Sequence, residues 1–249
     1  MIDADVLMGH YPFRPFPRPS HDPHQIKDYL QERGIQRACL ASLHAAFYAD
    51  PQQGNAEVLP QIRQDNFFLP VATLNPALPN WRATLARAAD EYGCHMVRLL
   101  PNYHQYSLAE PFVDDFLDAV QQLGVVIAIV KRLEDERMHP QLMKVPTVDN
   151  AEIVTLAQHY DQPVLILSAY LHEIKELAVV PNLYFDLAFA ETLNTMQRLT
   201  EAVTPDRLLF STHTPFFYAE AAIGKITQWQ TSPENRAGVA RGNLTHLLA

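Results

Sequence analysis

The sequence predicts a single α/β domain with the (β/α)8 barrel fold, spanning residues 1–249. Strand and helix segments alternate along the whole chain, and repeated strand–helix units over this length are typical of such a barrel. The strand segments are unbroken apolar runs, as in parallel strands that are buried on both faces. An open doubly wound sheet is the alternative. It would need a glycine-rich phosphate turn after an early strand, and the chain contains no GxGxxG sequence.

The first half of the chain contains five strand segments, at residues 2–8, 36–43, 67–74, 95–100 and 125–130. The fifth, Val-Val-Ile-Ala-Ile-Val, has the clearest apolar pattern. Helices are expected between the strands at residues 24–33, 55–63, 81–91 and 111–123. Three of these helices are followed by a glycine (Gly34, Gly93 and Gly124), and the last also begins with a proline, which is typical of helix boundaries.

The second half continues the same alternation. A helix at 151–160 leads to a strand at 163–167, and a short helix at 171–177 leads to a strand at 183–187. A helix at 191–202 leads to the last strand, at 207–211, and a final helical region covers 217–229 and 233–248. These segments bring the strands to the number that closes a barrel.

The composition excludes several classes of protein. Hydrophobic residues make up 48% of the chain, which excludes intrinsic disorder. The net charge of −9 argues against nucleic acid or an acidic membrane as a partner. The acidic N-terminus resembles no signal peptide, and no apolar run reaches the roughly 20 residues of a membrane helix. We therefore expect a cytoplasmic protein with reduced cysteines and a small-molecule partner, with self-association into a homo-oligomer left open.

Histidines follow four of the expected strands: His10, His44, His104 and His213. The carboxyl ends of barrel strands form one rim, where active sites of this fold lie. Each histidine alone is as well explained as an ordinary loop residue, but four on one rim indicate a site. His10 lies in a proline-rich loop, which we expect to be stiff because each proline fixes its φ angle.

Three arginines, Arg14, Arg98 and Arg132, are expected on the same rim. A guanidinium binds planar anions with two hydrogen bonds, so the arginines indicate capture of a carboxylate or phosphate. Internal pairing with acidic residues is the alternative, above all for Arg132. Asn102 and Tyr48 complete the expected substrate-binding set, together with Arg14, Arg98 and His104.

Two carboxylates lie within apolar strand segments, Asp5 in the first and Asp186 in the seventh. A carboxylate in such a place is unfavourable unless it is paired or functional. We expect Asp186 to orient a histidine or to pair with an arginine.

Several motifs make the chain resemble the amidohydrolase-related family of metal-dependent (β/α)8 hydrolases, over nearly its whole length. The motifs are Ile2-Asp3-Ala4, Gly9-His10-Tyr11-Pro12-Phe13-Arg14, Ser42-Leu43-His44-Ala45, the run from Val97 to His104, Glu134-Asp135-Glu136-Arg137, the run from Asp206 to Ser211, and Gly242-Asn243-Leu244.

The resemblance breaks at the family's metal ligands. The His-x-His pair of the first strand is replaced by Asp5 and Leu7, and a leucine cannot bind metal. Lys131 ends the fifth strand, Ser168 stands near the sixth-strand histidine position, and His213 takes the place of the eighth-strand aspartate. We therefore expect no metal and no other cofactor, with a divalent metal such as zinc as the less favoured alternative.

The resemblance implies a hydrolase that acts on a small carboxylated molecule, such as a lactone or an amide, here without a metal. His213 is the expected general base, because imidazole titrates near neutral pH. His10 or His44 would polarise the carbonyl, and Arg14 and Arg98 would bind the carboxylate. Two alternatives remain: a carboxy-lyase on the same barrel, and a relative that binds a ligand without catalysis.

Overall fold

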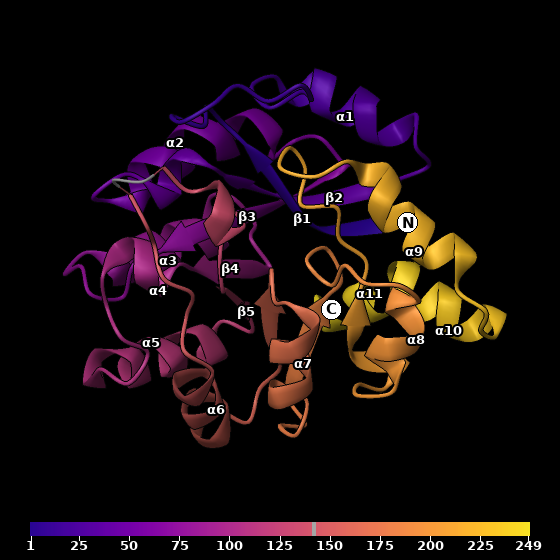
Figure 1. Cartoon of the computed structure of the whole chain (residues 1–249). Helices are drawn as coiled ribbons and strands as arrows, with labels where there is room; N and C mark the ends of the chain where they lie inside the picture. The colour runs from indigo at the N-terminus through magenta and orange to yellow at the C-terminus, as the bar shows by residue number, and fades with distance from the viewer. Residues whose placement is uncertain (141–142) are drawn as a thin grey trace.

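Eight parallel strands form a nearly closed barrel in the order β1 to β8, each paired with the next along the chain. The helices lie around the outside of the strands (Figure 1). This computed structural model describes residues 1–140 and 143–249. It confirms the predicted (β/α)8 barrel. Within the described residues, no helix has the length and apolar character needed to cross a membrane.

The strands are β1 (Ile2–Met8), β2 (Arg37–Ser42), β3 (Phe68–Leu74), β4 (Met96–Leu99), β5 (Val126–Val130), β6 (Val164–Leu167), β7 (Leu183–Asp186) and β8 (Leu208–Leu209). The α-helices are α1 (Pro23–Gln31), α2 (Pro51–Ile62), α3 (Trp81–Asp90), α4 (Pro101–His104), α5 (Pro111–Gln122), α6 (Asn150–His159), α7 (Leu171–Leu177), α8 (Thr195–Thr200), α9 (Ala219–Gln228), α10 (Pro233–Ala237) and α11 (Asn243–Leu247). Short turns of other helix types are η1 (His44–Ala46), η2 (Glu136–Met138), η3 (Pro205–Arg207) and η4 (Gly238–Gly242).

Alternate residues of the strands pack into two separate apolar clusters. The larger cluster lies between strands and helices and includes Leu40, Val97 and Phe185. The smaller cluster fills the barrel with residues such as Ala41, Met96, Ala128, Leu165 and Leu209. Both strand faces are therefore buried, which explains why the strand segments read as unbroken apolar runs.

Most predicted elements are present, with shifted ends. Helix α2 begins at Pro51 rather than at residue 55, because the Asp50 side chain caps it by accepting a hydrogen bond from the Gln52 amide (2.9 Å). Helix α8 begins only at Thr195, because Asn194 before it has a left-handed φ of 56°. The single turn of α4 follows β4, in a segment for which we predicted neither helix nor strand.

The seam between β8 and β1 closes the barrel through few backbone contacts. The Ala4 amide donates to the Phe210 carbonyl (2.9 Å), and the Leu7 amide donates to the Thr214 carbonyl (2.8 Å). Between these two bonds the pairing of β1 with β2 shifts register, from Asp3 to Val6. Strand β8 pairs with β7 only through Leu208 and Leu209, so it is much shorter than the predicted strand at 207–211.

The Asp3 side chain fills the gap in this seam. Its carboxylate accepts hydrogen bonds from the Thr212 amide (3.0 Å), the Thr212 hydroxyl (2.6 Å) and the Asp5 amide (3.1 Å). Burial raises the pKa of Asp3 to about 7, against the opposing effect of these three bonds, and the nearby charge of Asp5 adds to the rise.

The raised pKa of Asp3 predicts that stability falls as pH rises. The folded protein keeps the Asp3 proton between about pH 4 and pH 7, whereas the unfolded chain releases it, so the free energy of unfolding falls by up to about 1.4 kcal/mol per pH unit. The variant Asp3→Asn keeps the shape of the side chain and removes its titratable carboxyl group. Urea unfolding across this range should give a shallower pH dependence for Asp3→Asn than for the wild type. Asp118→Asn, at an exposed position on α5, should leave the pH dependence of the wild type unchanged. Equal pH dependences for all three proteins would refute the raised pKa of Asp3.

Candidate active site

The core of the candidate site is a buried group of three charged side chains. Asp5 lies between Arg98 and His213: Oδ1 is 3.0 Å from Arg98 Nη1, and Oδ2 is 2.5 Å from His213 Nδ1. Each of the three residues is at most 2% exposed. Arg98 and His213 belong to the predicted site set, and Asp5 connects them.

Three strands bring these residues together inside the barrel. Asp5 lies on β1 and Arg98 on β4, so the long arginine side chain connects strands that are separated by β2 and β3 in the sheet. His213 follows β8 and has a left-handed φ of 53°. This conformation is uncommon for a residue other than glycine, and it occurs here at the carboxyl end of the barrel, where active sites of this fold lie.

The hydrogen bonds define the charge state of His213. Nε2 is 2.7 Å from the Leu133 carbonyl oxygen, which can only accept, so Nε2 must carry a proton. Burial raises the pKa of Asp5, but the charges of Arg98 and His213 outweigh this effect, and the net pKa lies below the usual value. An ionised Asp5 also only accepts, so Nδ1 is protonated too. His213 is therefore an imidazolium.

The pKa of His213 agrees with this charge state. Burial alone lowers it, but the charge and hydrogen bond of Asp5 and the Leu133 carbonyl together raise it above the ordinary histidine value. Neither ring nitrogen has a free lone pair in this arrangement. The predicted general-base role would require His213 first to lose a proton and one of its two partners.

Asp186 lies at the end of β7 and is fully buried. Its carboxylate accepts hydrogen bonds from the Ser168 amide (2.7 Å), the Ala188 amide (3.0 Å) and the Ser211 hydroxyl. Burial raises its pKa, and the charge of Asp5 adds to the rise, so Asp186 lies within electrostatic range of the three charged residues. Its hydrogen bonds join the ends of β6, β7 and β8.

Some buried donors at this end of the barrel have no partner. Arg98 Nε and Nη2 and the Ser168 hydroxyl have no hydrogen-bond partner among the described residues. Ser168 also has a left-handed φ, of 62°. Buried polar groups are almost always satisfied, so these atoms are candidates for hydrogen bonds to a ligand or water.

The loop after β5 covers the mouth of the barrel. The Leu133 carbonyl contacts His213, and the Glu134 carboxylate accepts hydrogen bonds from the Tyr11 hydroxyl and the Arg14 guanidinium. Arg132 pairs with Glu173 of α7 through two bonds of 2.6 Å. Internal pairing, the alternative that we considered for the rim arginines, thus occurs for Arg14 and Arg132 as well as for Arg98, which pairs with Asp5.

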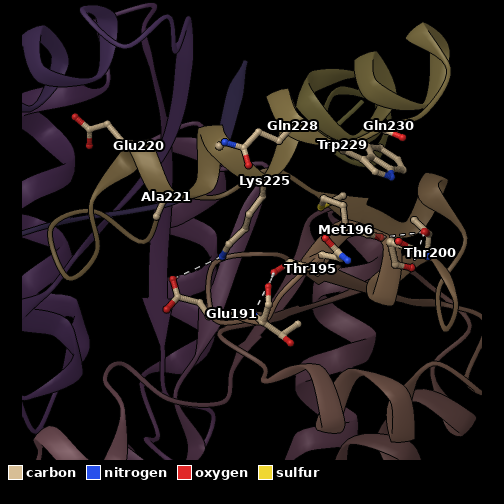
Figure 2. A pocket seen from close by; sticks show the side chains of 14 residues that line it. Glu191, Thr195, Met196, Thr200, Glu220, Ala221, Lys225, Gln228, Trp229 and Gln230 are labelled. Atoms are coloured by element: carbon tan, nitrogen blue, oxygen red, sulfur yellow. Dashed lines mark hydrogen bonds and ion pairs between the residues drawn. The ribbon is translucent and has the colours of Figure 1, made fainter.

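A cavity of about 1100 Å³ lies outside the barrel between α8 and α9, and none of the three charged side chains lines it. Figure 2 shows Lys225 in this cavity with its amine directed at Glu191, 3.8 Å away. The same amine donates to the Leu187 and Ala188 carbonyls, each at 2.9 Å, so it is held by the chain just after β7.

Three other predicted residues form a separate group nearer the surface. His44 Nε2 accepts from the His10 amide (2.7 Å), and His44 Nδ1 lies 2.6 Å from Glu57 Oε2. The Tyr48 hydroxyl donates to the same carboxylate of Glu57 (3.1 Å). The catalytic roles of His10 and His44 and the binding role of Tyr48 stay predictions.

His104 and Asn102, both on α4, contact backbone carbonyls. His104 Nε2 lies 3.0 Å from the Ala45 oxygen, and Asn102 donates to the Pro146 oxygen at 2.6 Å. Burial lowers the pKa of His104, against the effect of the Ala45 carbonyl. The predicted substrate-binding roles of both residues also stay predictions.

Arg98 is expected to be essential for stability, because its loss leaves the Asp5 carboxylate with one cationic partner in a buried place. Arg98→Met should lower the free energy of unfolding by about 3–5 kcal/mol, measured by urea denaturation at pH 7. Arg87→Met is the matched control, since Arg87 forms an exposed pair with Glu91 on α3 and should lose at most about 1 kcal/mol. Similar losses in both variants would contradict this description of the site.

Solved structures with the same fold include several decarboxylases. The chain is similar to 2,6-dihydroxybenzoate decarboxylase complexed with 2,6-dihydroxybenzoate, with 15% identity, a TM-score of 0.76 and coverage of 99% of this chain and 98% of the other. It is similar to dihydroxybenzoic acid decarboxylase from Polaromonas sp. JS666, with bound manganese and the inhibitor 2-nitroresorcinol (16% identity, TM-score 0.75, coverage 99% and 96%). It is also similar to 5-carboxyvanillate decarboxylase from Novosphingobium aromaticivorans, with bound manganese (12% identity, TM-score 0.77, coverage 99% and 96%). Identities this low show a common fold.

These structures correct our expectation about cofactors. We expected none, and that expectation is wrong for proteins of this kind, since two of the structures contain manganese. The described residues of this chain nevertheless do not fit the ion: they include no group of three or more His, Cys, Asp and Glu side chains able to hold it. Asp5 instead pairs with Arg98 and His213, and Lys131 contacts Glu173 (3.2 Å) and the Val148 carbonyl (2.8 Å).

Sequence comparison identifies the family. No curated protein matches the sequence significantly. A family model described as amidohydrolase matches residues 45–248, most of the barrel from η1 to α11, which confirms the resemblance inferred from the motifs. The chain belongs to the amidohydrolase family.

Proposed function

We propose that the protein is a carboxy-lyase that removes carbon dioxide from a small aromatic carboxylic acid at the carboxyl end of the barrel. The structural neighbours whose names state a reaction on hydroxybenzoates or carboxyvanillate support this choice of substrate class. It replaces the hydrolase that we expected from the resemblance as the favoured function.

One observation carries the choice between the two reactions, namely the protonated His213. Hydrolysis needs a base that takes a proton from water, whereas decarboxylation of an aromatic acid needs an acid. When the bond from the ring to the carboxylate breaks, its electron pair stays on the ring carbon, which takes up a proton, and the carboxylate leaves as carbon dioxide. An imidazolium held by Asp5 is suited to supply that proton through Nε2.

The unpartnered donors of Arg98 would orient the substrate. Nε and Nη2 together match the two oxygens of a carboxylate, or a carboxylate oxygen and a neighbouring ring hydroxyl. Asp186 would act as a positioning residue, because its bonds to Ser168 and Ser211 hold the strand ends next to Asp5. Substrate entry requires the Leu133 carbonyl to leave His213 Nε2.

Ligand binding without catalysis is the second candidate. It is favoured by the ion pair between Asp5 and Arg98, which ties up groups that an enzyme would leave free for its substrate, and by the loop that covers the mouth. Measuring whether carbon dioxide is released distinguishes this candidate from a carboxy-lyase.

Release of carbon dioxide from dihydroxybenzoates and 5-carboxyvanillate, with and without added manganese, tests the proposal. We expect turnover of at least one acid, and a loss of about 10²-fold or more in kcat/KM for His213→Asn, because the proton donor is removed. His246→Asn, at an exposed position on α11, is the matched control and should retain full activity.

Three results would contradict the proposal. Hydrolysis of lactones or amides without carbon dioxide release would restore the hydrolase. Saturable binding of these acids without turnover would favour the non-catalytic relative. Full activity of His213→Asn would remove His213 as the proton donor.

A further inference from the structure

The Glu134 carboxylate is buried at the barrel mouth in surroundings suited to an organic acid. The residue follows β5, is 3% exposed, and accepts hydrogen bonds from the Tyr11 hydroxyl and the Arg14 guanidinium. Arg14 Nε is buried and has no partner among the described residues, so the arginine has a further donor available. Burial and the hydrogen bond to Glu134 both raise the pKa of Tyr11, so its hydroxyl stays a donor at all ordinary pH values.

Aromatic rings surround this pair of donors. Tyr11 stacks on Phe16 with ring centres 5.5 Å apart, and it meets Phe216 edge-on at 5.1 Å. The Arg14 guanidinium lies over the rings of Tyr11 and Phe16, at 5.6 and 5.5 Å from their centres. One cation, one hydroxyl donor and apolar walls are the elements that a site for an aromatic carboxylate requires.

Leu133, the residue before Glu134, contacts His213, the proposed proton donor. The Leu133 carbonyl accepts from His213 Nε2 at 2.7 Å, so two consecutive residues of one loop supply an acceptor oxygen and a carboxylate to the mouth. A substrate acid of the proposed reaction would likewise bring an acceptor oxygen and a carboxylate to the mouth.

We infer that Tyr11 and Arg14 form a carboxylate-binding site for aromatic acids, and that the chain's own Glu134 fills this site in the closed structure. This site uses donors other than Arg98, which would hold the reacting carboxylate, and the inference rests on the proposed function only for its choice of aromatic acids. A Glu134 that merely fastens the loop would make the same contacts, so the test must distinguish binding of a free acid from loss of a structural bond.

The variant Glu134→Ala removes one methylene and the carboxylate, which leaves a space next to Tyr11 and Arg14 that a free acid can enter. Thermal unfolding of the full chain should show a lower Tm for this variant. Added benzoate should raise that Tm by about 3 °C or more at a tenfold excess over its Kd, and the rise should continue logarithmically at higher concentrations. Benzamide, which has the same shape without the charge, and sodium chloride at equal ionic strength should have much smaller effects.

Two further variants make the result specific. Adding Arg14→Met to Glu134→Ala should abolish the rise produced by benzoate, because the cation is lost. Glu136→Ala is the matched control: its carboxylate accepts from Arg132 (2.9 Å) and the Tyr170 hydroxyl (3.1 Å), but it is 40% exposed, and Arg132 stays paired with Glu173 when it is removed. Benzoate should therefore not restore the stability of this variant. If Glu134→Ala does not fold, Glu134→Gln should bind benzoate at least about tenfold more tightly than the wild type in calorimetric titration, because the competing charge is gone.

The inference fails if benzoate stabilises neither Glu134 variant, or if it acts equally on Glu136→Ala or on the variant that also carries Arg14→Met. Failure of the proposed function has a different signature. In that case benzoate would still bind through Arg14, while no aromatic acid would release carbon dioxide.

Discussion

The buried Asp5 carboxylate controls the arrangement of the barrel mouth. A single charge in an apolar barrel is strongly unfavourable, so Asp5 is accommodated only with Arg98 and His213 beside it. These contacts hold the Arg98 side chain of β4 and the segment after β8 in place relative to β1. They also keep His213 protonated, which in turn fixes the Leu133 carbonyl on Nε2 and brings the loop after β5 over the site.

The loop after β5 also carries charged side chains that form ion pairs at the rim of the barrel. Arg132 and Lys131 meet Glu173 of α7, while Glu134 meets Arg14 of the proline-rich loop after β1. Cations and carboxylates from segments far apart in the sequence thus pair at one end of the barrel. Each charged side chain is paired with one from another part of the chain, which explains how a protein of net charge −9 buries several arginines.

The sequence was sufficient for the fold, because strands buried on both faces leave an unmistakable apolar pattern. It could not give the short β8, since that depends on the Asp3 side chain replacing backbone pairing with β1. For the site, the direction of Arg98 could be predicted because it lies on β4, where side chains alternate between the two faces. His213 lies four residues beyond the end of β8, and its position depends on Asp5 and the Leu133 carbonyl. The side-chain directions of His10, His44 and Tyr48 could not be predicted, because these residues lie beyond the strand ends. His44 and Tyr48 contact Glu57, and the His10 amide donates to His44. Glu134 belongs to a motif of the resemblance, but its burial could not be predicted, because a charged loop is usually solvated.

The pairing of Asp5 with Arg98 also constrains how this sequence can change over time. Replacing either residue alone leaves the other as a buried charge short of a partner, so intermediates with one substitution are selected against. Descendants of this sequence can therefore lose the pair only through closely linked double changes. In a collection of relatives, positions 5 and 98 should vary together, and the pairs of residues found there would trace how this branch diverged from its ancestors.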